Sequence, residues 1–103
     1  MSDILTELAA VIETRKSADP ESSWSAKLLS QGVEKAAEKF GEEAVEAIIA
    51  AVKRDPVNLT SEAADVLYHL LVMLAASDVK LKDVFAELER RQNVSGLTEK
   101  ANR

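Results

Sequence analysis

Apolar residues recur along this chain at intervals of three and four, which is the spacing of one face of an α-helix. The pattern predicts helices from Ser2 or Asp3 to about Lys16, from Ala26 to Ser30, from Val33 to about Arg54, from a cap at Asn58 or Thr60 to Ala76, and from Leu81 to about Arg91. No alternating strand pattern or hairpin dipeptide competes with these helices. The predicted fold class is therefore all-α, a helical bundle of four to five helices.

The fourth predicted helix is apolar on nearly every side, and a helix of that kind is usually buried. Its apolar residues include Val66, Leu67, Leu70, Leu71, Val72, Met73 and Leu74. The other helices of one chain offer few partners for such a surface. We therefore expect a homodimer or a higher homo-oligomer in which a second copy covers part of it.

Length and composition limit the number of domains, the kinds of partner and the location that the chain can have. At 103 residues the chain is expected to form a single domain, 1–103, with a polar and mobile tail from Gln92 to Arg103. The net charge of -5 disfavours nucleic acid and membrane surfaces as partners. The apolar run from Ala63 to Ala76 looks too short to span a bilayer. With no targeting signal at the N-terminus, a cytoplasmic location is expected.

Two acidic pairs stand out against this background. Glu43 and Glu46 are three residues apart in the third helix, and Glu62 and Asp65 repeat the spacing in the fourth. Each pair therefore lies on one helix face. Because the chain has no cysteine and a single histidine, oxygen ligands for Mg²⁺ or Mn²⁺ are the metal chemistry open to it. A solvated acidic face is the alternative for either pair, but both pairs lie in apolar helices, where unpaired charge is costly.

The acidic pairs resemble the Glu-x-x-Glu and Glu-x-x-Asp signature of the all-α nucleoside-triphosphate pyrophosphohydrolases, which include the MazG-like enzymes and dimeric dUTPases. Three longer strings are similar to one branch, the phosphoribosyl-ATP pyrophosphohydrolases of histidine biosynthesis. These strings are Ser23–Leu28, Lys39–Glu43 and Glu62–Leu71, with a further match at Ser95–Lys100. Trp24 stands where that branch more often has Tyr, and the cyclohydrolase domain fused to some members is absent from this sequence.

The resemblance implies a nucleotide substrate, phosphoribosyl-ATP, that is cleaved to phosphoribosyl-AMP and pyrophosphate. The expected metal ligands are Glu43, Glu46, Glu62 and Asp65, and the expected catalytic acids are Glu42, Glu43 and Glu46. Among them Glu42 is a candidate general base or a partner of the ligands. Two other classes stay open, namely a house-cleaning pyrophosphohydrolase of a noncanonical nucleotide and a metal-free helical interaction module.

Cations that bind the polyphosphate must lie elsewhere in the chain, although most lysines simply cover a helix surface. Lys35 and Lys39 lie four residues apart on the face that leads to the acids, and Lys27 lies in a family-like string. Arg90 and Arg91 are candidates for a ribose phosphate. His69 is expected to be a packed histidine or a support for the ligands, rather than a ligand itself. Trp24 and Tyr68 are expected in the core more than against an adenine base.

Overall fold

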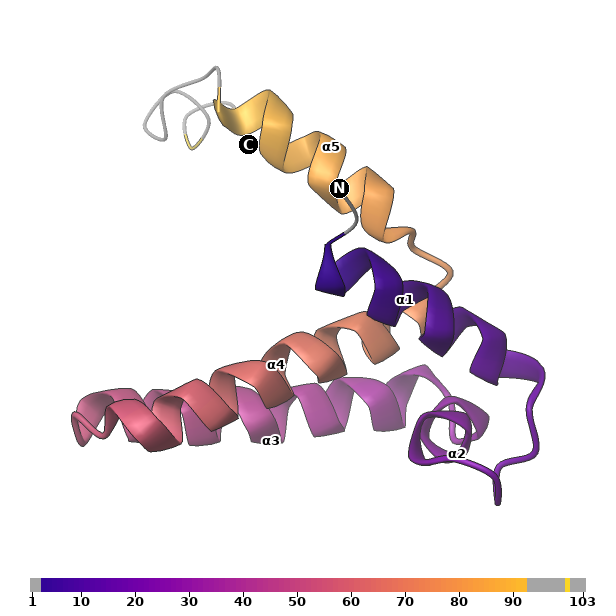
Figure 1. Cartoon of the computed structure of the whole chain (residues 1–103), viewed down its shortest axis with the longest axis horizontal. Coiled ribbons are helices and arrows are strands. Elements are labelled where there is room, and N and C mark those ends of the chain that lie inside the picture. The colour runs from indigo at the N-terminus through magenta and orange to yellow at the C-terminus, as the bar shows by residue number, and fades with distance from the viewer. Residues whose placement is uncertain (1–2, 93–99, 101–103) are drawn as a thin grey trace.

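The computed structural model describes residues 3–92 and Lys100, and every regular element among these residues is a helix. The elements are α1 (Ile4–Thr14), the 3₁₀ turn η1 (Arg15–Ser17), α2 (Trp24–Ser30), α3 (Val33–Val52), α4 (Pro56–Ala76) and α5 (Leu81–Gln92) (Figure 1). The predicted all-α class is confirmed. The predicted tail lies outside the described residues, apart from Gln92 at the end of α5 and Lys100.

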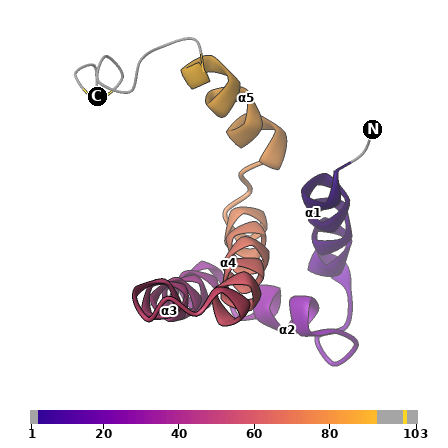
Figure 2. The ribbon, with the colours of Figure 1, turned by 60° about the vertical axis from the view of Figure 1, so that its left-hand side comes forward.

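The antiparallel pair of α3 and α4 forms the body of the molecule. The two helices lie side by side in both views, with α2 beside the start of α3 and α1 beside the end of α4 (Figures 1 and 2). The buried core gathers where these four helices meet, and its members are Ile12, Leu28, Ala36, Leu71, Val72 and Ala75. A fully buried side chain the size of leucine or isoleucine stabilises the fold by roughly 1.5–3 kcal/mol. The α3–α4 pair extends well beyond this core.

The turn between α3 and α4 differs from the prediction. Arg54 has a φ of 60°, and the amide of Asp55 donates to the carbonyl of Ala50 at 3.1 Å. This geometry is that of a Schellman motif, so α3 ends at Val52, two residues before the predicted end. The left-handed backbone at Arg54 is what reverses the chain and brings α4 back along α3.

Asp55 and Pro56 follow this turn and open α4. The Asp55 carboxylate accepts a hydrogen bond from the amide of Asn58 at 3.0 Å, and Pro56 is the first residue of the helix. Proline is favoured there because its missing N–H would have had no intrahelical partner. The prediction of a cap at Asn58 or Thr60 was therefore wrong.

Serine and aspartate caps also set the starts of the first two helices. Asp3 accepts from the amide of Thr6 at 2.7 Å, which agrees with the predicted start of α1. Ser23 accepts from the amide of Ala26 at 2.9 Å, so α2 begins at Trp24, two residues earlier than predicted. Gly32, with a φ of 91°, separates α2 from α3 as expected, because that backbone conformation favours glycine.

A second reversal at Asp78, with a φ of 57°, ends α4 and directs α5 away from the bundle (Figures 1 and 2). Lys16 fixes this turn, because its ammonium lies 2.9 Å from the Asp78 carboxylate and 3.0 Å from that of Glu13. These contacts raise the pKa of Lys16 and lower the pKa of Asp78. No residue of α5 is buried in this chain.

α4 is less buried than its composition predicted. Four of its residues are buried, namely His69, Leu71, Val72 and Ala75, while Leu67 is exposed. The prediction that the other helices of one chain do not fully cover this helix is therefore confirmed. With 21 residues, α4 is long and apolar enough to cross a membrane by length and composition, contrary to expectation. That criterion is weak evidence, since the core helix of a soluble protein passes it, and a carboxylate such as Asp65 near the bilayer centre would be costly.

Candidate metal centre

Three carboxylates converge where α3 and α4 face each other. One ligand atom each from Glu43, Glu62 and Asp65 can be chosen so that all three lie within 4.8 Å of one another. The antiparallel pairing explains this convergence, since it brings the middle of α3 against the first half of α4. The three-residue spacing then places Glu62 and Asp65 on the face of α4 that meets Glu43. The structure thus brings together three of the four acids that the sequence proposed as ligands.

Glu46, the fourth acid, lies at the border of this cluster. Its side chain is exposed, and its charge and hydrogen bonding act on both Glu43 and Glu62. Glu46 is therefore close to the cluster without belonging to the group of converging oxygens.

Glu43 and Glu62 hold protons more tightly than ordinary carboxylates do. Burial, followed by hydrogen bonding with Glu46 and by the neighbouring negative charges, raises the pKa of Glu43 to about 7. Burial is also the first cause that raises the pKa of Glu62, with Glu46 and Asp65 adding to it. Like charges that are crowded into a half-buried site favour the protonated form. A cation would remove that repulsion.

The residues present fit a hard divalent cation. The Oε2 atoms of Glu43 and Glu62 are both buried, and neither has a hydrogen-bond partner among the described residues. Buried acceptors without partners are unusual in a folded protein, and a bound ion can supply the interaction that they lack. Carboxylate oxygens are also the ligands that Mg²⁺ and Mn²⁺ prefer. The donor set therefore matches the predicted chemistry.

Two of the proposed cations accompany the acids on α3. The ammonium of Lys39 lies 3.3 Å from the Glu42 carboxylate, and that of Lys35 lies 3.4 Å from Glu38, one turn earlier. Lys39 and Glu42 both act electrostatically on His69 of α4, so this pair lies on the side of α3 near the cluster. Glu42 is exposed and is not one of the three converging carboxylates.

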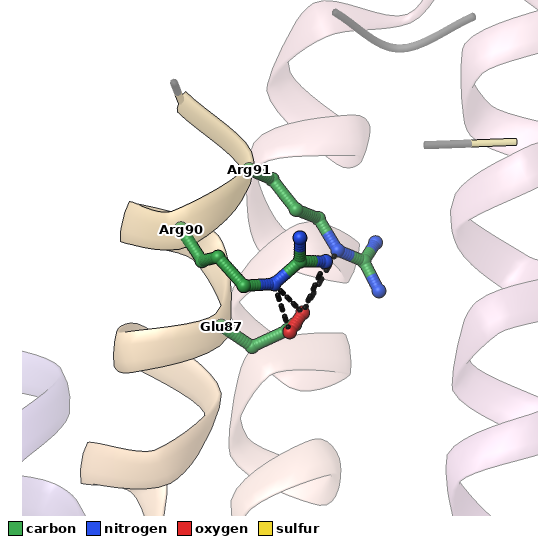
Figure 3. Close-up of polar contacts among 3 residues, drawn as sticks. All are labelled: Glu87, Arg90 and Arg91. Atoms are coloured by element: carbon green, nitrogen blue, oxygen red, sulfur yellow. Dashed lines mark hydrogen bonds and ion pairs between the residues drawn. The ribbon is translucent and has the colours of Figure 1, made fainter. Parts of the chain in front are cut away.

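The other proposed cations are placed elsewhere. Lys27 is exposed on α2. Arg90 and Arg91 both bind Glu87 of their own helix, at 2.9 Å and 3.4 Å, and together they lower the pKa of Glu87 to about 2 (Figure 3). Because α5 points away from the bundle, the structure does not bring these two arginines to the acids (Figure 1). Their predicted contact with a ribose phosphate stays a prediction.

A polar contact that the sequence did not suggest lies beside the cluster. The hydroxyl groups of Ser25 and Tyr68 lie 2.5 Å apart, which links α2 to α4. Tyr68 also packs edge-on against His69, with ring centroids 5.0 Å apart. Trp24, expected in the core, is 53% exposed at the start of α2, because its neighbours Ser23 and Ser25 make the contacts that fix this turn.

Comparison with known proteins places the chain in a family. The family model described as phosphoribosyl-ATP pyrophosphohydrolase matches residues 5–92. A phosphoribosyl-ATP pyrophosphatase of Dinoroseobacter shibae is 70% identical over 97% of this chain and 98% of its own length. The protein of the same name from a Jannaschia species is 74% identical over 96% of this chain and 97% of its own length. The chain therefore belongs to the phosphoribosyl-ATP pyrophosphohydrolase family.

Proposed function

We propose that this chain hydrolyses phosphoribosyl-ATP to phosphoribosyl-AMP and pyrophosphate in histidine biosynthesis, with Mg²⁺ as its cation and Mn²⁺ as a substitute. The observation that carries the proposal is the convergence of Glu43, Glu62 and Asp65 from two helices within 4.8 Å. The names of the similar proteins supply the substrate. A cytoplasmic location fits such a biosynthetic step and is part of the proposal.

The acids of α3 and α4 would hold the cation. Glu43, Glu62 and Asp65 provide the converging oxygens, and Glu46 completes the set from the border of the site. When bound, the metal ion would neutralise phosphate charge and lower the pKa of a water that it carries. A bound cation would favour the ionised form of Glu43, whose free carboxyl has a pKa of about 7.

The neighbouring residues of α3 then act on the substrate and the water. Lys39 and Lys35 are the cations best placed to bind phosphate oxygens, because they precede the acids on the same face. Glu42 is the candidate base for the attacking water, and Lys39 at 3.3 Å holds its carboxylate near the cluster. In this scheme the water attacks between the α and β phosphorus, and pyrophosphate leaves as one unit.

Product analysis with several substrates tests the proposal. Purified protein with Mg²⁺ should release pyrophosphate from phosphoribosyl-ATP, and far less from a panel of ordinary and noncanonical nucleoside triphosphates. Orthophosphate should not appear before pyrophosphate. Efficient cleavage of a noncanonical nucleotide in place of phosphoribosyl-ATP would indicate a house-cleaning enzyme. Release of single phosphates would contradict cleavage between the α and β phosphorus.

Substitution of a proposed ligand tests the metal site directly. Glu43→Gln should lower turnover at least about 100-fold, which corresponds to a loss of roughly 2.7 kcal/mol of transition-state stabilisation. The matched control is Glu34→Gln, since Glu34 is an exposed acid of the same helix outside the cluster. Near-normal activity of folded Glu43→Gln would remove Glu43 from the metal site.

We also propose that the working unit is a homodimer or a higher homo-oligomer. One face of α3 carries four exposed apolar residues, namely Val45, Ile48, Ile49 and Val52. At about 100° per residue this face lies opposite the side that packs on α4, and Glu42 and Glu46 lie between the two sides. A second copy that covered the exposed face would therefore approach Glu42 and Glu46 at the edge of that face. The active site would then lie near the interface.

A further inference from the structure

His69, the only histidine of the chain, is the one polar residue that is buried among the described positions. Its side chain is 6% exposed, and its Nδ1 atom is buried without a hydrogen-bond partner among the described residues. The pyrophosphohydrolase scheme above gives this residue no role. A buried imidazole nitrogen without a partner costs free energy unless some state of the protein supplies the partner.

The position of His69 on α4 indicates that partner. His69 follows Asp65 by four residues, so the two side chains lie on one face of the helix, a turn apart. Side chains of a helix lean toward its N-terminus, and the imidazole therefore leans over the turn that carries Asp65. Asp65 is also the exposed member of the three converging carboxylates, and so the one that the surrounding protein restrains least.

An aromatic neighbour restrains the imidazole ring itself. Tyr68 packs edge-on against the ring at 5.0 Å and is in turn bound to Ser25 of α2. A ring restrained in this way has little freedom to turn its unpartnered nitrogen toward solvent.

We propose that His69 is a positioning residue of the metal centre, whose Nδ1–H donates a hydrogen bond to the Asp65 carboxylate when a divalent cation is bound. The inference rests on the cation binding of the proposed function. A carboxylate that binds a metal is commonly hydrogen-bonded by a neighbouring group, and loss of such a partner typically weakens metal affinity about 10–100-fold. The bond would fix the side chain of Asp65 in the orientation that binding requires.

The protonation state of the ring is compatible with this role. Burial lowers the pKa of His69, and the positive charge of Lys39 acts in the same direction, while the charges of Asp65 and Glu42 oppose both. The imidazole is therefore neutral at pH 7 and carries a single N–H. That proton must reside on Nδ1 for the proposed bond to form. Measurement of the tautomer therefore tests the proposal.

Nitrogen-15 NMR of the imidazole reads this tautomer in the wild-type protein, where a single histidine gives a single set of signals. Titration with Mg²⁺ alone should leave Nδ1 protonated at saturation and slow its exchange with water. If Mg²⁺ saturates the protein while the imidazole proton lies on Nε2, the role proposed for His69 is wrong, but the proposed metal site is supported. Failure of Mg²⁺ to bind wild type any better than Glu43→Gln would overturn both.

Substitutions of His69 separate positioning from packing. His69→Asn places an amide near the position of Nδ1, whereas His69→Gln places its amide near that of Nε2. Mn²⁺ affinity, measured by electron paramagnetic resonance, should fall about 10–100-fold in His69→Gln and stay within about threefold of wild type in His69→Asn. Thermal unfolding checks that both variants fold. Equal loss in the two variants, or none in His69→Gln, would assign His69 to packing alone.

Discussion

Among single residues, Glu43 has a pKa near neutral pH, so its protonation makes the stability of the fold depend on pH there. Its pKa is raised to about 7 in the folded chain, so between its ordinary value and about pH 7 the folded state binds a proton that the unfolded state has lost. This contribution is present in acid and is lost as the pH rises through about 7. Without divalent ions, the melting temperature of wild type should therefore fall relative to that of Glu43→Gln between about pH 4.5 and pH 7, and should change little relative to it at higher pH.

The comparison with Glu43→Gln is needed because other groups titrate in the same range. The raised pKa of Glu62 acts in the same direction as that of Glu43. The lowered pKa of His69 acts in the opposite direction, because its contribution is present above its ordinary pKa and is lost in acid. Saturating Mg²⁺ should abolish the fall in the melting temperature of wild type that is attributed to Glu43. Parallel pH profiles for the two proteins would show that Glu43 does not hold the extra proton.

The residues of the cluster show how far spacing predicts a site. The two acidic pairs, each three residues apart, were sufficient to predict that carboxylates meet between two helices. Spacing could not predict that Glu46 lies at the border, because that depends on the axial register of α3 against α4. It also could not place Arg90 and Arg91, since the direction of α5 is set by the turn at Asp78, which no local pattern reveals.

Among the elements, α4 depends on the cap at its first turn. Asp55→Ala removes the acceptor for the amide of Asn58 and should lower the free energy of unfolding by about 1 kcal/mol, within a range of roughly 0.5–2 kcal/mol. For a domain of this size that corresponds to a melting temperature lower by roughly 4–8 °C. Calorimetry of the two proteins measures this difference.

Asp55→Asn is the matched control, because its amide oxygen can accept the same hydrogen bond. It should unfold close to the wild-type temperature. An equal loss in Asp55→Asn and Asp55→Ala would show that charge at the start of α4, and not the cap, supplies the stability.

The boundaries of the elements were predicted less well than their number. An Asp-Pro pair can end one helix or begin the next, and the sequence pattern does not distinguish the two uses. Here Asp55 and Pro56 serve the second purpose, because the left-handed residue Arg54 has already ended α3. A non-glycine residue in that conformation carries no sequence signal. The first helix was predicted more closely because Asp3 has one structural use, as a cap.

At the scale of the whole molecule, the burial expected from the apolar residues of α3 and α4 differs from the burial that the structure of one chain shows. The apolar composition of α4 predicted a helix that is covered on all sides, and in one chain the structure buries part of it and leaves Leu67 exposed. It also finds α3 apolar on two opposite sides, one of which packs on α4. A helix with apolar residues on both sides is usually buried on both. The main question about the assembly is therefore which surface covers the exposed apolar face of α3.

The last prediction concerns that assembly. Ile48 is 61% exposed on the open face of α3, so Ile48→Glu should leave the fold of one chain intact while it places a charge in the proposed interface. Sedimentation at micromolar concentration should then give a dimer or larger species for wild type and a monomer for Ile48→Glu. Ile4→Glu is the control, because Ile4 is 73% exposed on α1, and it should sediment as wild type does. Activity should fall together with dissociation, because Glu42 and Glu46 lie between the open face of α3 and the side that carries the acidic cluster. A fully active wild-type monomer would contradict both the assembly and the placement of the active site beside the interface.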